Sequence, residues 1–157
     1  MANLKVCAPL VCEVSGVCGG ACAISRSDSV FWRSPEFTEI ARKQQEMEDA
    51  LAREANRILI CDTDVLATGV WHERYLQSRS PEVESIAESH RHDLYLLTDC
   101  DLPFVQDGLR DGESIRQWMT RRFEEVLTER GLPWVTISGE GIRRLSAAVR
   151  EVEKLLA

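Results

Sequence analysis

The stretch Ile58-Leu-Ile-Cys-Asp-Thr-Asp64 runs four apolar residues directly into two aspartates. A short apolar run that follows a long helical pattern is typical of a strand buried on both faces of a parallel sheet. Asp62 then lies at the carboxyl end of that strand, and this is the edge where open α/β sheets bind their ligands. The stretch therefore predicts an α/β domain with a site at this edge.

The two aspartates admit two interpretations. Residues two apart on an extended chain point to the same side, so Asp62 and Asp64 can face one site, where a carboxylate holds Mg²⁺ on the phosphates of a nucleotide. This is the Walker B pattern. The alternative is structural: an aspartate ends the strand and caps a helix that starts near Val65.

Length and charge exclude several classes of function. The 157 residues suffice for one domain with a real core. With 19 Lys and Arg against 26 Asp and Glu, the net charge is -7, which argues against broad contact with nucleic acid or an anionic bilayer. The sequence has neither an apolar run long enough to span a membrane nor the pattern of a secretory signal, so we expect a cytoplasmic protein.

Helical and strand patterns alternate from Ser34 onward. Ser34 as N-cap and Pro35 at the first helical position begin a long amphipathic helix that ends near Asn56. We expect the face of this helix opposite its apolar stripe to be solvated; it carries Arg42, Lys43, Glu46 and Glu48.

The remaining elements continue the alternation. Helices are expected over residues 65–76 and 80–90, and strands over 93–98 and 134–137. A helical stripe from Ile115 to Leu127 ends at Gly131, and a final helix is lined by Ile142, Leu145, Val149, Val152 and Leu156. The pattern predicts a three-layer α/β domain with a mainly parallel sheet.

Residues 1–33 differ in character, being rich in Cys, Gly, Ser and Val. Pro9 interrupts the strand-like run from Leu4 to Val14. The cysteines of this segment contain no C-x-x-C, so zinc or iron–sulfur binding has little support from their spacing; they are Cys7, Cys12, Cys18 and Cys22. The other two, Cys61 and Cys100, are most simply small buried hydrophobic residues.

A second candidate site is rich in arginine. The loop Asp107-Gly-Leu-Arg110 precedes a helix that carries Arg116, Arg121 and Arg122, and the planar guanidinium group matches phosphate oxygens. Alternatively, these arginines pair with neighbouring acidic residues, namely Glu113, Glu124 and Glu125.

Aromatic and histidine residues have simpler explanations. Trp71 and Tyr75 share a helix face and can stack on a base, but packing in the core is the favoured interpretation. The three histidines have neither metal-binding spacing nor a nearby nucleophile pattern, and we expect them at the surface or at helix ends; they are His72, His90 and His92.

Taken in order, these segments resemble one known family. The blocks that carry the resemblance include Asn56-Arg-Ile-Leu-Ile-Cys-Asp-Thr-Asp64, Asp93-Leu-Tyr-Leu-Leu97, Asp101-Leu-Pro-Phe-Val-Gln-Asp-Gly-Leu-Arg-Asp-Gly112 and Gly131-Leu-Pro133. They are similar to the P-loop kinase domain of NadR-type proteins, over about Ser34 to the C-terminus. The D-T-D and D-G-x-R blocks together are the specific part of the match.

The resemblance implies a P-loop NTPase-like fold and an ATP-dependent kinase that phosphorylates the 5′-hydroxyl of nicotinamide riboside with Mg²⁺ and ATP. Carried over, Asp62 is the Walker B aspartate near Mg²⁺, and Asp64 is the carboxylate near the acceptor ribose. Arg110 is a lid arginine on the transferring phosphoryl group, and Arg116 and Arg121 are candidates for binding the nucleotide.

The chain departs from the family in its first part. A family member opens with a strand and a G-x-x-x-x-G-K-[ST] loop, but the lysines of this chain are Lys5, Lys43 and Lys154, and none lies in such a motif. We therefore expect an atypical segment over 1–33 joined to an incomplete kinase-like domain over 34–157, with the first strand and the Walker A loop replaced. Kinase activity should be weak or absent, and a non-catalytic nucleotide-responsive module is the alternative.

The replaced first strand has a structural consequence. Either the sheet has a gap at that position or the run from Leu4 to Val14 fills it, although Pro9 opposes a central strand. We expect a marginally stable N-terminus.

Overall fold

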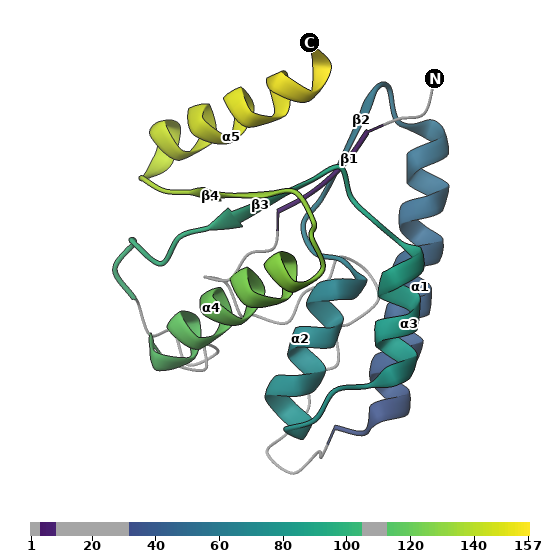
Figure 1. Ribbon diagram of the computed structural model, residues 1–157. Coiled ribbons are helices and arrows are strands. Elements are labelled where there is room, and N and C mark those ends of the chain that lie inside the picture. Colours follow the sequence, from purple (N-terminus) through teal and green to yellow (C-terminus); the bar gives the residue numbers. More distant parts are fainter. Residues whose placement is uncertain (1–3, 9–31, 105–112) are drawn as a thin grey trace.

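Four strands form the sheet around which the chain folds. The computed structural model describes residues 4–8, 32–104 and 113–157, and Figure 1 shows their arrangement. In chain order the elements are β1 (Leu4–Cys7), α1 (Ser34–Glu54), β2 (Ile58–Cys61), α2 (Val65–Leu76), α3 (Pro81–Ser89), β3 (Leu94–Thr98), α4 (Glu113–Glu129), β4 (Trp134–Ile137) and α5 (Gly141–Leu156). The expected alternation of helices and strands is confirmed.

All pairings in this sheet are parallel, and the strand order is β2-β1-β3-β4. β1 pairs with β2 along its whole length, with Leu4 opposite Ile58 and Cys7 opposite Cys61. On its other side, Val6 lies opposite Leu94 of β3. The chain thus places β2 on one side of β1 and β3 on the other.

Helices cover the two faces unequally, as Figure 1 shows. The helices α1 to α4 lie on one face of the sheet, where Cys7, Tyr95 and Leu97 pack against α2 and α4. On the opposite face α5 lies alone, and Val6 and Leu96 point toward it. The side chains of β1 and β3 alternate between these two faces, as the period of a strand requires. The three-layer α/β fold is confirmed.

The central position of the sheet is filled from the N-terminal segment. β1 lies between β2 and β3, so the sheet has no gap at this point. The strand ends at Cys7, two residues before Pro9, and this explains how a run that contains a proline can still supply a central strand. The part of the expected run from Pro9 to Val14 lies outside the described residues.

Two expectations about burial are wrong. β2 is not buried on both faces, because it is the edge strand and Ile60 is 63% exposed. β3, which lies inside the sheet, is buried along its full length. On α1, Glu48 is 5% exposed rather than solvated, because its side chain points toward the sheet, while Met47 of the expected apolar stripe is 48% exposed.

The final helix also packs on a different face from the one expected. Of the expected stripe, Ile142, Leu145 and Val149 are exposed. Val152 of that stripe does pack on the sheet, and α5 adds to it a neighbouring set of residues, Ala147, Ala148 and Leu155, whose alanines allow a close approach.

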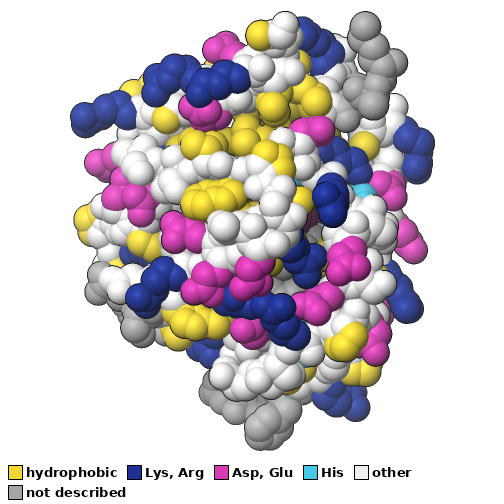
Figure 2. Space-filling view, viewed as in Figure 1, with side chains coloured by type: hydrophobic (Ala, Val, Ile, Leu, Met, Phe, Trp, Pro, Cys, Tyr) yellow, Lys and Arg dark blue, Asp and Glu magenta, His cyan; other side chains and the backbone are white. Residues whose placement is uncertain are grey.

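The surface in the view of Figure 2 divides in a corresponding way. Hydrophobic side chains gather in the upper part, where α5 lies, and acidic and basic side chains intermingle over α2 and α4. A shallow groove between α2, α3 and α4 is lined by such charges, including Glu73, Arg79 and Glu129. Of the residues in the predicted arginine-rich site, Arg122 lines this groove. Among the described residues, no helix is both long and apolar enough to cross a membrane.

Candidate functional site

The carboxyl ends of the parallel strands define the edge where a ligand site is expected. Because the chain leaves β1 for β2 on one side and later adds β3 on the other, the direction of strand addition reverses at β1. Such a reversal opens a crevice at the carboxyl ends of the strands, and ligands of open α/β sheets bind there. Asp62, which directly follows β2, is exposed at this edge.

Two other aspartates follow β3, and both bind other side chains or the backbone of the protein. Asp99 accepts a hydrogen bond from Ser138 Oγ at 2.9 Å. Asp101 accepts one from the backbone N–H of Gly139 and forms an ion pair with Arg144. Both therefore fasten the turn between β4 and α5.

Asp64, unlike the exposed Asp62, is enclosed by the fold. It is the N-cap of α2 and is 1% exposed. One carboxylate oxygen accepts the backbone N–H of Ala67 at 2.9 Å, and the other accepts the hydroxyl of Tyr95 at 2.7 Å. Burial raises the pKa of Asp64 above its ordinary value. The structural interpretation, a helix cap, is what the geometry shows for this residue.

The predicted arginines are not gathered around a phosphate site within the described part of the chain. Arg110 lies outside the described residues. Arg116 is buried, donates to the carbonyl oxygen of Leu102 at 2.9 Å and lies over the ring of Phe104. Arg121 is exposed and donates to the carbonyl oxygen of Gln117 at 3.3 Å.

Arg122 and the aromatic pair have structural partners. Arg122 donates to Glu73 at 2.9 Å and to Glu125 at 2.8 Å, and the second of these ion pairs is one that the sequence suggested. Trp71 and Tyr75 stack on each other with ring centroids 5.8 Å apart, and Trp71 packs against the core. The expected packing against the core is found for Trp71, whereas Tyr75 is 38% exposed.

A polar cluster under the sheet was not expected from the sequence. It lies between α1, the end of β2 and the segment that leads into β3. All three histidines are buried, so the expectation of surface positions is wrong, although His90 does lie at a helix end as the C-cap of α3. His72 bonds Ser34 Oγ and the carbonyl oxygen of Ser78, whereas His90 and His92 belong to the cluster.

One half of the cluster surrounds His90. Its Nε2 atom lies 3.0 Å from Glu48 Oε2 and 3.1 Å from Lys5 Nζ. Lys5 in turn forms an ion pair with Asp49 at 3.0 Å. That hydrogen bond lowers the pKa of Asp49 against the opposing effect of burial. These contacts hold α1 against β1, the first strand of the chain.

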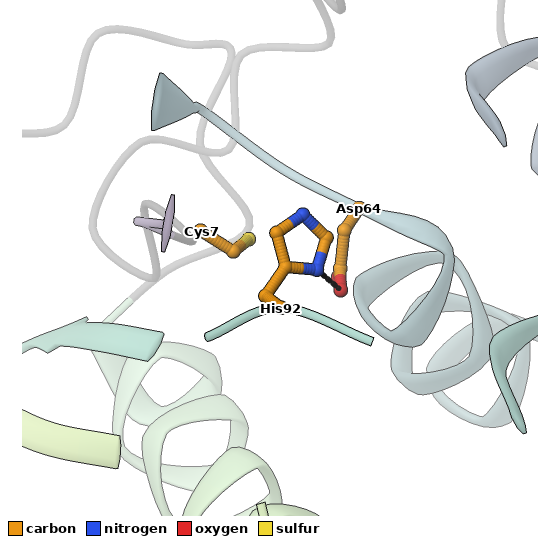
Figure 3. A group of neighbouring side chains, drawn as sticks. All are labelled: Cys7, Asp64 and His92. Carbon is orange, nitrogen blue, oxygen red and sulfur yellow. Dashed lines mark ion pairs between the residues drawn. The ribbon is translucent and has the colours of Figure 1, made fainter. Parts of the chain in front are cut away.

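The other half surrounds His92, whose side chain is fully buried. Its Nδ1 atom lies 3.4 Å from Asp64 Oδ2 and 3.3 Å from the hydroxyl of Tyr95. Its Nε2 atom lies 3.3 Å from Glu48 Oε2, yet the geometry is not that of a hydrogen bond. Figure 3 shows His92 between Asp64 and Cys7, with the Cys7 sulfur turned toward the ring.

Two buried thiols complete the cluster. Cys7 and Cys61 lie opposite each other on β1 and β2. Burial, followed by the nearby carboxylates of Glu48 and Asp64, raises the pKa of Cys61 to about 12. Burial and then Asp64 raise the pKa of Cys7 well above its ordinary value. Both groups are therefore protonated thiols at neutral pH when no cation is near.

The sequence held weak signals for this cluster. Cys7 and Cys61 each end an apolar run of the length of a strand, and His90 and His92 alternate just before the next strand. Because these residues are far apart in the sequence, only the parallel pairing of β1 with β2 and β3 brings them together. Spacing along the chain could not reveal them.

Comparison with known proteins adds family information. The profile of the AAA domain family matches residues 20–144, which is most of the chain. The chain is 27% identical over 115 residues to the Trifunctional NAD biosynthesis/regulator protein NadR of Escherichia coli K12, a match that covers 72% of this chain and 28% of that protein. It is 27% identical over 112 residues to the protein of the same name from Salmonella typhimurium, covering 70% of this chain and 27% of that protein.

The chain thus spans little more than a quarter of the relatives that it matches. The family match and the parallel four-stranded sheet agree with each other, because both describe an α/β nucleotide-binding domain. The chain belongs to the AAA domain family and is a NadR-like P-loop domain.

Proposed function

We propose that this domain binds a Mg²⁺–nucleotide complex, with ATP as the preferred ligand, at the carboxyl edge of its sheet. The observation that carries the proposal is the exposed carboxylate of Asp62 at the end of β2, next to the point where the strand order reverses. Membership of the AAA domain family and the similarity to NadR support nucleotide as the ligand.

The residues at this edge fit a magnesium ion held in the manner usual for nucleotide enzymes. Mg²⁺ is commonly bound through one or two carboxylates together with waters and the phosphates of the substrate, and Asp62 can supply one such carboxylate. Bound Mg²⁺ neutralises charge on the phosphates. Asp64 does not reach this position, because both of its oxygens are engaged by Ala67 and Tyr95.

We further propose that transfer of phosphate to the 5′-hydroxyl of nicotinamide riboside is weak or absent in this chain. The chain has three lysines, and none lies in a G-x-x-x-x-G-K-[ST] loop that would hold the β- and γ-phosphates. Asp64, the residue proposed near the acceptor hydroxyl, would have to leave its bonds to Tyr95 and Ala67 in order to act there. A lid role for Arg110, and nucleotide contacts for Arg116 and Arg121, remain part of this proposal.

A second candidate function is a nucleotide-responsive module without catalysis. The specific observation in its favour is the buried, hydrogen-bonded state of Asp64, which withdraws one of the two aspartates from the edge of the sheet. In that case ATP binds with Mg²⁺ and changes the stability of the domain, but no phosphate is transferred.

Thermal unfolding tests nucleotide binding. At a concentration of Mg²⁺–ATP about a hundredfold above Kd, binding to the folded state stabilises it by about 2.7 kcal/mol, which corresponds to a rise in Tm of roughly 5–10 °C for a domain of this size. Asp62→Ala should lose most of this rise. Glu54→Ala, which removes an exposed carboxylate at the opposite edge where α1 ends, should keep it. Equal shifts in all three proteins would refute a role for Asp62.

A phosphoryl-transfer assay separates the two functions. Nicotinamide riboside and radiolabelled ATP are incubated with the full chain, and labelled mononucleotide is measured. Binding without product supports the non-catalytic module. Product that disappears with Asp62→Ala but persists with Glu54→Ala supports a kinase.

A further inference from the structure

A set of metal-ligating side chains lies under the sheet, and it includes Cys61, the residue before Asp62, but not Asp62 itself. Glu48 from α1, Cys61 from the end of β2 and His92 from the segment before β3 place their ligand atoms within 4.8 Å of one another. All three residues are buried. A second group of ligand atoms within the same limit comprises Cys7, Asp64 and His92, so His92 belongs to both groups.

Two atoms of the first group lack hydrogen-bond partners. Glu48 Oε1 and His92 Nε2 are buried without one, and their side chains are 6% and 0% exposed. An unsatisfied buried polar atom costs about 1–3 kcal/mol, more when the group is charged. Two unsatisfied buried atoms on side chains of one ligand group point to a missing partner in the cluster.

The separation of these groups suits a tetrahedral ion. Zinc binds imidazole nitrogen and carboxylate oxygen at about 2.0 Å, so two ligands at a tetrahedral angle lie about 3.3 Å apart. His92 Nε2 and Glu48 Oε2 are 3.3 Å apart without forming a hydrogen bond. The distance is therefore the one expected across a zinc ion.

The other side of the ring carries the support that metal-binding histidines usually have. Such a histidine donates its second ring N–H to a carboxylate or carbonyl oxygen, which fixes its orientation. His92 Nδ1 lies 3.4 Å from Asp64 Oδ2. Asp64 is itself held by Tyr95 and by the backbone of Ala67. The Asp64 carboxylate, which orients His92, is therefore held in place by these two bonds.

We propose that this domain binds one Zn²⁺ ion through Glu48, Cys61 and His92 Nε2, with Asp64 orienting His92. Cys7, opposite Cys61 on the neighbouring strand, belongs with Asp64 and His92 to the second group, and Figure 3 shows its sulfur turned toward the His92 ring. A mixture of thiolate, imidazole and carboxylate favours zinc over Mg²⁺, which prefers oxygen ligands alone. The ion joins α1, β2 and the segment before β3, and Asp62 is not among its ligands.

Cobalt substitution tests the proposal on the full chain. The protein is stripped with a chelator and titrated with Co²⁺ while the absorption of cobalt–thiolate bonds is recorded, and Zn²⁺ is then added as a competitor. The wild type should bind one Co²⁺ per chain and release it to Zn²⁺. Cys61→Ser should weaken binding at least tenfold, and Asp64→Asn by about 10–100-fold. Cys100→Ser, the matched control, should bind like the wild type because Cys100 instead contacts Thr120.

Two results would overturn the proposal. One is no stoichiometric metal in the wild type, which would mean that a proton on His92 satisfies the two carboxylates instead. The other is binding that is unchanged by Cys61→Ser, which would place the metal on other cysteines. If Cys61→Ser does not fold, X-ray absorption of zinc in the wild type decides: sulfur together with nitrogen or oxygen ligands is expected, and a shell without sulfur or with four sulfurs contradicts the assignment.

Discussion

At the scale of single residues, the side chain of Tyr95 combines core packing with a buried hydrogen bond. It is 1% exposed, its ring packs between β3 and the helices, and its hydroxyl donates to Asp64. Burial and the carboxylate of Asp64 raise its pKa above the ordinary value, so the hydroxyl remains a donor at any pH where the protein folds. The helix cap and the orientation of His92 both depend on this one hydrogen bond.

Tyr95→Phe should therefore destabilise the protein by about 1–3 kcal/mol, because a buried carboxylate oxygen of Asp64 loses its donor. Urea unfolding followed by circular dichroism measures the change. Tyr75→Phe serves as the control, since Tyr75 is 38% exposed, and it should change stability by less than about 0.5 kcal/mol. Equal effects of the two substitutions would mean that the bond to Asp64 contributes little.

The sequence alone did not assign separate roles to Asp62 and Asp64. It offered both a metal site and a helix cap for the pair, and the structure assigns the cap to Asp64 and leaves Asp62 exposed. It placed Glu48 in solvent because a charged residue opposite an apolar stripe is normally solvated. Burial of Glu48 depends on partners from β3 and its preceding segment, and helical periodicity carries no information about them.

At the scale of elements, β1 is the strand that anchors the N-terminal part of the chain in the sheet. Its backbone is bonded on both sides: Leu4 N–H donates to the carbonyl oxygen of Arg57, and Asp93 N–H donates to that of Lys5. Its two inner side chains, Val6 and Cys7, are completely buried. A strand of four residues with these contacts closes the centre of the sheet.

Hydrogen exchange tests whether β1 is as secure as its position suggests. The amide of Leu4 and that of Asp93, which donates to β1, should exchange at rates close to those of the amides in β3, since all belong to the same sheet. Exchange that is orders of magnitude faster at Leu4 than in β3 would instead support the sequence-based expectation of a marginally stable N-terminus.

The last helix provides a second test at this scale. Leu145 is 57% exposed, whereas Leu155 packs against the face of the sheet that contains Val6. Leu155→Ala should cost about 1–2 kcal/mol through lost burial. Leu145→Ala, the same change on the exposed face, should cost less than about 0.5 kcal/mol. If chemical denaturation gives the reverse order, the helix packs on the stripe that its sequence suggested.

At the scale of the whole molecule, the sequence was sufficient for the architecture. The short apolar strands, the helix-start signals at Ser34 and Ser80, and the glycine after α4 predicted the order of elements correctly, because each is a local signal, although the N-cap of α1 is Arg33 rather than Ser34. The buried cluster around His92 could not be predicted, since its members come from three strands or their flanks and from α1. Local patterns determine which elements form, but strand order determines which side chains meet.

The proposed binding of Mg²⁺–ATP depends on Asp62 at the carboxyl edge of the sheet. Isothermal titration of the full chain with ATP in the presence of Mg²⁺ tests this most directly, with Asp62→Ala and the distant control Glu54→Ala measured under the same conditions. The account predicts binding of one ATP per chain that depends on Mg²⁺, is lost in Asp62→Ala and is kept in Glu54→Ala. No heat of binding in the wild type, or equal affinity in all three proteins, would contradict it.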